Sequence, residues 1–181
     1  MALKSATEHF FMINPSRRPM FQQYVICPVQ VRHHEDIARL AGQLGYESSV
    51  EQVHRRLDGM RDAQQYAVYV AEERAGNVVG WIGVHIFRAV EMDSCASISG
   101  LVVDQCLRSQ GIGEMLLDAA EQWAQSFGCE VITVQSNVMR ERAHSFYRRN
   151  GYAHVKTQHT FCKNLSQRNE GKGRLQATLG L

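Results

Sequence analysis

The chain has 181 residues, of which 44% are hydrophobic and 21% charged, a composition typical of one globular domain with its own core. Its 20 Lys and Arg against 18 Asp and Glu give a net charge of +2, but residues 24–162 carry only thirteen basic against sixteen acidic side chains. A nucleic-acid-binding domain needs a basic stripe on its folded body, so this balance argues against that class.

No apolar run approaches the ~20 residues of a membrane span, and residues 1–20 lack the apolar core and cleavage site of a secretory signal. We therefore expect a cytoplasmic protein without a membrane partner. The number of cysteines is odd, and no two of them form a CxxC pair. In place of a disulfide framework or a zinc site, we expect reduced, mostly buried thiols at Cys27, Cys95, Cys106, Cys129 and Cys162.

The first part of the domain is predicted to hold one strand and two helices. Residues 24–31 are typical of a strand that Pro28 interrupts. Residues 32–45 place their apolar side chains on one helical face before a stop at Gly45. Residues 48–62 open on a serine cap and repeat this spacing, so a second helix is expected to follow the first.

Three β-rich segments come next. Residues 64–73 and 78–90 are joined by the turn-forming sequence RAGN, which predicts a hairpin. Residues 95–104 end in an apolar run that is typical of a buried strand.

After a glycine-containing loop, the pattern returns to helix and strand. Residues 112–128 predict a long helix, 129–136 a strand rich in β-branched side chains, and 139–151 another helix. Residues 153–163 predict a last strand or hairpin, and 164–181 form a polar tail. A strand, a glycine loop, a helix and a further strand make a βαβ unit, which places ligands at the carboxyl ends of its strands.

The loop before the long helix, residues 108–113, reads RSQGIG. Glycine lets the backbone approach an anion closely, and the N–H groups and positive dipole end of a helix start favour phosphate oxygens. The loop lacks the GK[ST] ending of a P-loop, and Leu116 stands where a dinucleotide fingerprint needs its third glycine. A pyrophosphate bound outside those two folds is the expected ligand.

The motifs around this loop resemble the acyl-CoA site of the GNAT superfamily of N-acetyltransferases. The family's [QR]-x-x-G-x-[GA] core is matched by Arg108, Gly111 and Gly113, after the apolar strand LVV and before a helix that carries FYRRNGY. The resemblance implies an α/β fold with a mixed, mostly antiparallel central sheet, a splayed βαβ acyl-CoA site and flanking helices. The GNAT domain would cover residues 24–163, with residues 1–23 as an N-terminal extension.

The resemblance also implies which residues bind acetyl-CoA, the expected cosubstrate. The strand before the loop would splay from its neighbour and pair its free backbone groups with pantetheine, while the loop amides would hold the pyrophosphate. The alternative is that the two glycines only shape a tight turn. The implied cofactor-binding residues are Leu101, Val102, Val103, Arg108, Ser109, Gln110, Gly111, Ile112, Gly113, Glu114 and Asn137.

By the same resemblance, Tyr147 would lie near the CoA sulfur and protonate the departing thiolate, with thiol positioning or core packing as alternatives. A phenol with a pKa of about 10 stays protonated at neutral pH and can donate to a thiolate. Asn137 could bind the pantetheine arm, although relatives often place this asparagine seven residues before the tyrosine, where Arg140 stands. Arg140 would then share that work or contact phosphate. Arg148 and Arg149 would reach the 3′-phosphate or form a solvated helix face.

The general base stays open at this stage. An amine nucleophile is mostly protonated at neutral pH, so some group must accept its proton. Many relatives use a carboxylate on the strand before the loop, and the segment SCASISGLVV has none. The candidates are Glu91, Asp93, His85, His144 or a water chain to solvent.

The acceptor region is expected to involve the helix pair within residues 33–62 and the side chains of Trp81, His85 and Phe87. Ordinary sheet packing is the alternative for these aromatic side chains. The sequence does not identify the acceptor.

The leading hypothesis is an N-acetyltransferase that moves an acetyl group from acetyl-CoA to a primary amine by direct attack, because no cysteine occupies a matched motif position. The amine would belong to a small molecule or a peptide, and neither a metal nor a nucleic acid is implied. A non-catalytic acyl-CoA-binding sensor is the alternative, favoured by the missing strand carboxylate. Pairing of exposed edge strands would allow a homodimer.

Overall fold

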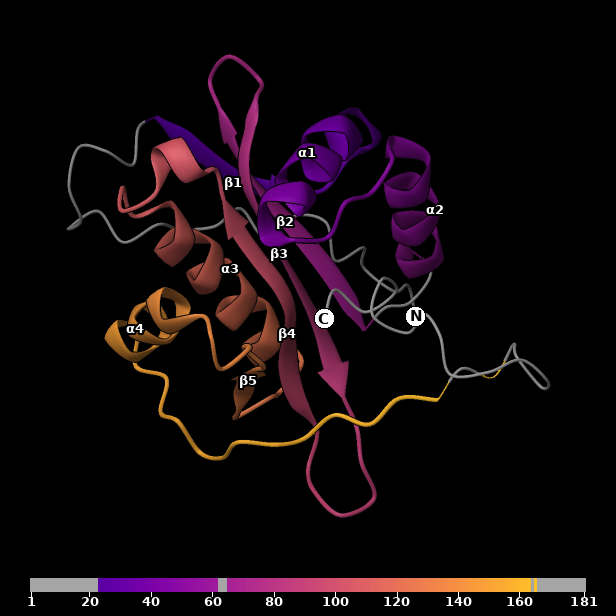
Figure 1. Ribbon diagram of the computed structural model, residues 1–181, viewed down its shortest axis with the longest axis vertical. Coiled ribbons are helices and arrows are strands. Elements are labelled where there is room, and N and C mark those ends of the chain that lie inside the picture. The colour runs from indigo at the N-terminus through magenta and orange to yellow at the C-terminus, as the bar shows by residue number, and fades with distance from the viewer. Residues whose placement is uncertain (1–22, 62–64, 164, 166–181) are drawn as a thin grey trace, which may run out of the picture.

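A computed structural model describes residues 23–61, 65–163 and 165. Most of the predicted N-terminal extension and polar tail therefore lies outside the described residues. The described chain forms one five-stranded sheet in the order β1-β2-β3-β4-β5 (Figure 1). The strands are β1 (Tyr24–Pro28), β2 (Tyr66–Glu73), β3 (Val78–Phe87), β4 (Cys95–Val103) and β5 (Ile132–Val134).

The first four strands are antiparallel to their neighbours, and only β4 and β5 run parallel. The predicted hairpin is the β2–β3 pair, whose turn includes Gly76 with a positive φ of 89°. The parallel β4–β5 pair is connected by a helix, as the βαβ pattern in the sequence predicts. These observations confirm the mixed, mostly antiparallel sheet.

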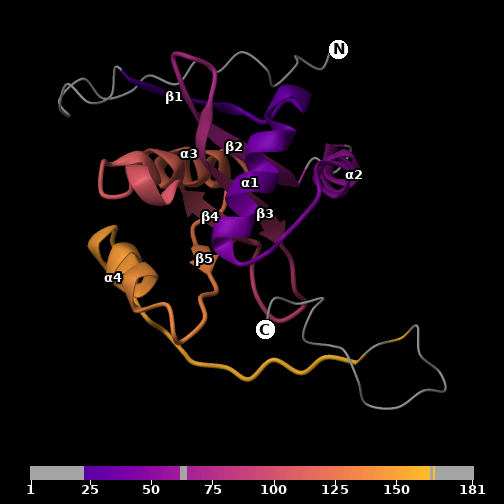
Figure 2. The ribbon, with the colours of Figure 1, turned by 45° about the horizontal axis from the view of Figure 1, so that its top comes forward.

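Four helices cover the two faces of the sheet. The helices α1 (His34–Leu44) and α2 (Val50–Arg61) lie on one face, and α3 (Ile112–Ser126) and α4 (Glu141–Arg149) lie on the other (Figures 1 and 2). Single 3-10 turns precede α1 at Val31–His33 and follow β4 at Gln105–Leu107. None of the described helices is long and apolar enough to cross a membrane.

The core divides into two clusters, one on each face. The larger cluster packs α3 against the sheet through side chains such as Ile82, Ile112 and Leu116, which are almost completely buried. The smaller cluster packs α1 and α2 against the opposite face, with Leu40 and Val70 at its centre. Because burial of apolar area is the main stabilising term, α3 is the helix most firmly fixed to the sheet.

The sheet opens between β4 and β5. The two strands pair only from Ala96 opposite Ile132 to Ile98 opposite Val134. The register of β4 against β3 shifts here, so that Ser99 is the extra residue between Ile98 and Gly100. From Gly100 to Val103, β4 keeps its pairing with β3 but has no strand on its other side among the described residues. This gap confirms the predicted splayed site.

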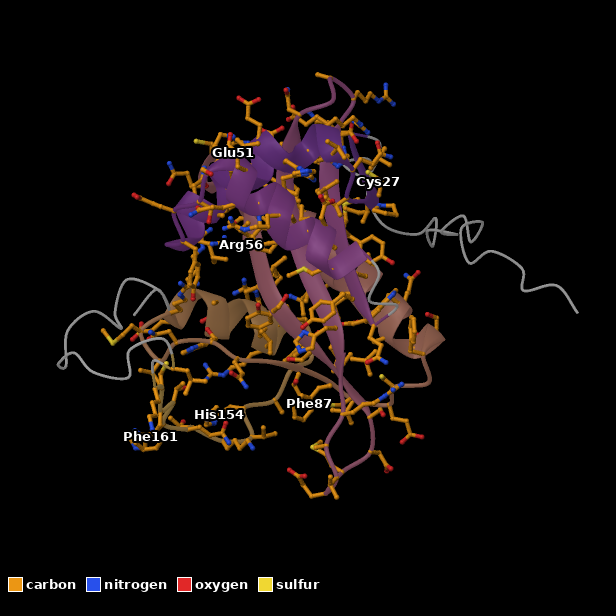
Figure 3. All side chains as sticks on the ribbon, turned by 90° about the vertical axis from the view of Figure 1, so that its right-hand side faces the viewer. Cys27, Glu51, Arg56, Phe87, His154 and Phe161 are labelled. Atoms are coloured by element: carbon orange, nitrogen blue, oxygen red, sulfur yellow. The ribbon has the colours of Figure 1, made fainter. Side chains whose placement is uncertain are left out.

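Several local expectations are wrong. The strand expected at 129–136 is confined to three residues, and α4 begins two residues later than predicted. Residues 153–163 form neither a strand nor a hairpin but an extended, exposed segment, in which Val155 and Phe161 are 83% and 92% exposed (Figures 1 and 3). A strand needs a backbone partner, and the nearest strand in sequence, β5, has only three paired residues.

The cysteines are free thiols, but the expectation that most are buried is also wrong. Only Cys95 and Cys129 are buried, Cys27 is half-buried, and Cys106 and Cys162 are exposed. The two buried thiols lie in or beside the short β4–β5 ladder, where hydrophobic packing explains them.

Candidate active site

The backbone of the glycine loop has an unusual conformation at the carboxyl end of β4. Ser109 has a positive φ of 65°, and Gly111 has a positive φ of 81°. A side chain at positive φ is sterically disfavoured, so the conformation of Ser109 must be enforced by its surroundings. Backbone turns of this kind aim successive N–H groups into one concavity that binds anions.

Helix α3 starts inside this concavity. Gly111 is its N-cap residue, and the N–H of Met115 donates to the carbonyl of Gly111. The amides of residues 109–113 have no hydrogen-bond acceptor in the described part of the chain. They point to the positive end of the α3 dipole, where a phosphate oxygen would satisfy them. We refer to residues 108–114 as the cradle.

The two cradle glycines serve different purposes. A Cβ added at Gly111 would meet no atom within 4 Å, so glycine is needed there for its positive φ and not for space. A Cβ added at Gly113 would lie 3.1 Å from the ring of Phe146. Glycine at this position lets α4 pack closely against the start of α3.

Three side-chain contacts hold the cradle from different elements. The hydroxyl of Tyr24 in β1 donates to Gln110 Oε1 at 3.3 Å. Arg108 Nε donates to the carbonyl of Val103 at 3.2 Å, which folds the loop back on β4. From α4, the guanidinium of Arg142 donates to Ser109 Oγ at 3.3 Å. Arg108 therefore has a structural task, and Arg142 brings a positive charge to the cradle.

A fourth connection joins the base of the cradle to α1. Asp104 accepts from the N–H of Cys106 at 3.1 Å and pairs with Arg39 at 2.6 Å. Gln43 accepts from the N–H of Gln105 at 2.9 Å. The N–H of Cys106, followed by the Arg39 guanidinium, lowers the pKa of Asp104. The charged form of this carboxylate fixes α1 relative to the loop.

The predicted pantetheine strand lies along the gap. Leu101, Val102 and Val103 pair on one side with β3, and on the other side no described strand occupies their edge. Their side chains are anchored in the two core clusters. A rigid strand edge with unpaired N–H and C=O groups can pair with the amides of an extended ligand.

Tyr147 projects from α4 into the larger core cluster, where it packs against Phe146 at 5.3 Å and Tyr152 at 5.5 Å between ring centroids. Burial raises the pKa of Tyr147 to about 12, and the positive charge of Arg140 opposes a part of that rise. The phenol is therefore fully protonated at neutral pH and able to donate. The neighbouring Tyr152 hydroxyl donates to Glu121 at 2.9 Å.

Asn137 organises the turn that precedes α4. Its Oδ1 accepts from the N–H of Met139 at 2.9 Å, and its carbonyl accepts from the N–H of Arg140 at 2.9 Å. The ring Nε2 of His144 also lies 3.0 Å from this carbonyl. The Asn137 side chain keeps only its NH₂ group for a ligand. Arg148 and Arg149 are exposed farther along α4.

The candidate general bases are spread over the molecule. Glu91 and Asp93 lie in the exposed connection between β3 and β4, at the end of the sheet opposite to the cradle. His85 pairs with Ser97, stacks on Tyr66 at 4.9 Å, and its Nδ1 has no partner among the described residues. Desolvation lowers the pKa of His85, so its ring is neutral at neutral pH.

Of the predicted acceptor residues, Trp81 lies beside Gly100 and the end of α1. A Cβ at Gly100 would lie 2.9 Å from the Trp81 ring and 3.8 Å from Leu44 Cδ2. The missing side chain thus lets the indole cover β4 at the point where the strand leaves β5. Phe87 lies at the far end of β3 and is 45% exposed, away from this point (Figure 3).

A hollow of about 130 Å³ opens elsewhere, between α2 and the β1–β2 edge, with Leu57, Met60 and Tyr66 in its lining. The strand β3 separates β2 from β4, so this hollow is not part of the gap. The two sites are distinct.

A further cluster of metal-ligand side chains, Cys27, His33 and Glu72, has ligand atoms within 4.8 Å of one another (Figure 3 labels Cys27). His33 Nδ1 accepts from the N–H of Gln30 at 3.1 Å, so the neutral ring carries its proton on Nε2, the atom 3.4 Å from Glu72. Both Glu72 oxygens accept from Arg32, at 2.6 and 2.8 Å. Glu72 is thus paired with Arg32 and accepts from the Cys27 thiol at 3.6 Å, while the buried His33 Nε2 makes no hydrogen bond among the described residues.

Sequence reasoning missed three parts of this site: the bulge at Ser99, the Arg39–Asp104 connection and the Arg142 contact with Ser109. A bulge leaves no mark in a hydrophobic pattern. Arg39 and Arg142 lie on amphipathic helices, and arginines on the solvent-exposed face of such helices are common without a specific partner. The only available signal was that Asp104 directly follows an apolar strand.

Comparison with known proteins identifies the family of the chain. The model of the acetyltransferase (GNAT) family matches residues 33–152, a range that contains the cradle, the gap and Tyr147. The chain belongs to the GNAT acetyltransferase family. The aminoalkylphosphonate N-acetyltransferase of Salmonella typhimurium is 40% identical to this GNAT chain over 80 residues, 44% of the chain. The matched region spans about half of that relative, 52% of its length.

Solved structures agree on the fold. The aminoglycoside 6′-N-acetyltransferase AAC(6')-IG from Acinetobacter haemolyticus superposes with a TM-score of 0.69 at 19% identity, covering 78% of this chain and 99% of that one. AAC(6')-Iy in complex with the bisubstrate analogue CoA-S-monomethyl-acetylneamine superposes with a TM-score of 0.69 at 17% identity, covering 78% and 98%. At such identities the likeness establishes the fold and not the acceptor.

Proposed function

We propose that this GNAT protein, through a domain of residues 24–163, transfers the acetyl group of acetyl-CoA to the primary amine of a small molecule by direct attack. Three observations support the proposal: the cradle amides have no acceptor among the described residues, the edge of β4 is unpaired beyond β5, and Tyr147 on α4 is protonated. Each of these three features suits a different part of acetyl-CoA.

The pyrophosphate would lie on the cradle, on the amides of Ser109, Gln110, Gly111, Ile112, Gly113 and Glu114 at the start of α3. Pantetheine would extend along Leu101, Val102 and Val103, pairing its two amides with the free strand edge. Asn137, which keeps an NH₂ donor, would contact the other side of that arm.

The transfer itself needs one bond formed and one broken. The neutral amine nitrogen attacks the acetyl carbon, the bond from that carbon to sulfur breaks, and the Tyr147 hydroxyl gives its proton to the departing sulfur. A phenol can act as this acid because it is protonated at neutral pH. Holding both reactants in the gap supplies proximity, which is a large part of the rate.

We propose that water takes the amine proton and returns one to Tyr147. A general base must lie within one water of the amine. His85 lies two register positions along β3 from Gly83, the partner of Gly100, about 7 Å along the strand, and its ring stacks on Tyr66. Glu91 and Asp93 lie farther still, and His144 is engaged with Asn137.

A small amine fits the comparisons, since the relatives are named for aminoalkylphosphonate and aminoglycoside acetylation. The proposal assigns the reaction to the cytoplasm, with neither nucleic acid nor metal as a partner. The exposed outer edges of β1 and β5 are where a homodimer would pair.

The test is a transfer assay with a panel of primary amines, which follows the free CoA thiol and confirms the acetylated product by mass spectrometry. Tyr147→Phe should slow turnover by about 10²- to 10⁴-fold while leaving the dissociation constant for acetyl-CoA within about twofold of wild type. An unchanged rate removes Tyr147 from the mechanism. Binding of acetyl-CoA without transfer to any amine would favour the non-catalytic sensor.

A further inference from the structure

Arg140 reaches from the start of α4 across to the end of α1. Its Nη2 donates to the carbonyl of Leu44 at 2.8 Å. A Cβ placed on Gly45, the residue that ends α1, would lie 3.9 Å from the same nitrogen. One hydrogen bond thus positions the guanidinium between two helices that are 96 residues apart in sequence.

The charge of Arg140 is not neutralised within the described residues. No carboxylate there lies within 4 Å of its guanidinium, and its side chain is exposed. By contrast, Arg32 is paired with Glu72, and Arg39 is paired with both Asp36 and Asp104. A guanidinium has five N–H donors, so the bond to Leu44 leaves a face that can bind an anion in a bidentate way.

Two observations place this charge near Tyr147 and Gly100, where the proposed function puts the thioester. Arg140 acts electrostatically on the Tyr147 hydroxyl, and its partner Leu44 touches the space above Gly100, where β4 leaves β5. The cradle lies at the other end of the same gap and has its own cation, Arg142.

We propose that Arg140 binds an anionic group on the acceptor, so that the substrate class is a short primary amine with a phosphonate, carboxylate or sulfonate a few bonds from its nitrogen. The proposal rests on the proposed function, because it assumes that the thioester lies beside Tyr147. The proposed function assigns the phosphates of CoA to the cradle, so the anion at Arg140 would belong to the acceptor. Arg140 is thus a specificity-determining residue.

The test compares acceptors of equal length: aminoethylphosphonate, β-alanine and taurine carry an anion, and ethanolamine does not. Wild type should show the higher kcat/KM for at least one of the anionic amines. Arg140→Gln keeps an N–H donor for Leu44 but removes the charge. It should raise the KM for that anionic amine by at least about tenfold and leave the KM values for ethanolamine and acetyl-CoA within twofold.

Arg142→Ala is the matched control, because it removes an arginine of α4 that contacts the cradle and not Leu44. It should raise the KM for acetyl-CoA and leave the ratio of anionic to neutral amines unchanged. If Arg140→Gln uses the anionic amines as well as wild type does, the guanidinium is only a clamp between α1 and α4, and the inference is overturned while the proposed function stands.

A wild type that acetylates none of these amines contradicts the proposed function, and binding then decides the inference separately. Titration of aminoethylphosphonate, β-alanine and taurine into the CoA-saturated protein should give heat in wild type and none in Arg140→Gln. Absence of heat in wild type would overturn the inference as well.

Discussion

The two ends of the gap beside β4 are built in different ways. The cradle is held by hydrogen bonds from β1, β4, α1 and α4, and α3 behind it is packed on the larger core cluster. The acceptor end is closed by the indole of Trp81, by Leu44 and by one hydrogen bond from Arg140. The first end is held by the backbone and by contacts from four elements, whereas the second depends on a few side chains.

This difference follows from what each end must bind. A pyrophosphate has one shape, and backbone N–H groups bind it wherever a strand, two glycines and a helix start meet. An acceptor is recognised by side chains that can change without changing the fold. In the proposed function, the scaffold therefore binds acetyl-CoA, and single residues such as Arg140 would select the amine.

The largest expected effect is on the free energy of unfolding, and it should differ between the two core clusters. Leu116→Ala removes a fully buried side chain beneath the cradle and should lower the free energy of unfolding by about 2–5 kcal/mol. Leu57→Ala, in α2, removes a partly buried side chain that lines the hollow and should cost about 1 kcal/mol. Urea denaturation measures both. Equal losses would mean that α2 is as firmly fixed as α3.

A smaller effect, which depends on pH, is expected when Asp104 is replaced: the loss of stability should be larger at neutral pH than in acid. The pKa of Asp104 is lowered in the folded protein, so its stabilisation is complete above the unfolded value of about 3.9 and disappears as the pH falls through the folded value. Asp104→Asn should therefore cost about 1 kcal/mol at pH 6 and much less near pH 3. The exposed Asp93→Asn is the control and should cost little at either pH. A constant loss for Asp104→Asn would contradict the role of its charge.

The smallest effect should appear in tryptophan fluorescence. The chain has two tryptophans, Trp81 at the acceptor end and Trp123 in α3. In Trp123→Phe, acetyl-CoA should change the Trp81 emission, because the acetyl end would lie beside Gly100. In Trp81→Phe, the emission of Trp123 should stay constant. A response from Trp123 alone would place the ligand away from the gap.

Much of the sheet and of the cradle could be predicted from the sequence, because both follow from local patterns. Alternating apolar residues fixed the β2–β3 hairpin, and the order of strand, RSQGIG and helix located the cradle. The predicted strand or hairpin at 153–163 failed although its residues alternate. Alternation reports how a segment could pack, not whether a partner strand is available.

The acceptor end could not be predicted for a different reason. The approach of Arg140 to Leu44 and of Trp81 to Gly100 joins elements that are distant in sequence. The motif spacing indicated only that Arg140 stands where relatives often have an asparagine. Its separation from every described carboxylate became visible once α1 and α4 were placed together.

The most direct measurement is a calorimetric titration of acetyl-CoA into wild type, Gly111→Val and Gly128→Val. Both glycines have positive φ, 81° and 75°, and open space around the Cβ position, but Gly111 starts α3 in the cradle and Gly128 follows its other end. The two substitutions therefore introduce similar backbone strain. We expect wild type and Gly128→Val to bind alike and Gly111→Val to bind at least about tenfold more weakly. Equal binding by folded Gly111→Val, or no binding by wild type, would contradict the assignment of the cradle to acetyl-CoA.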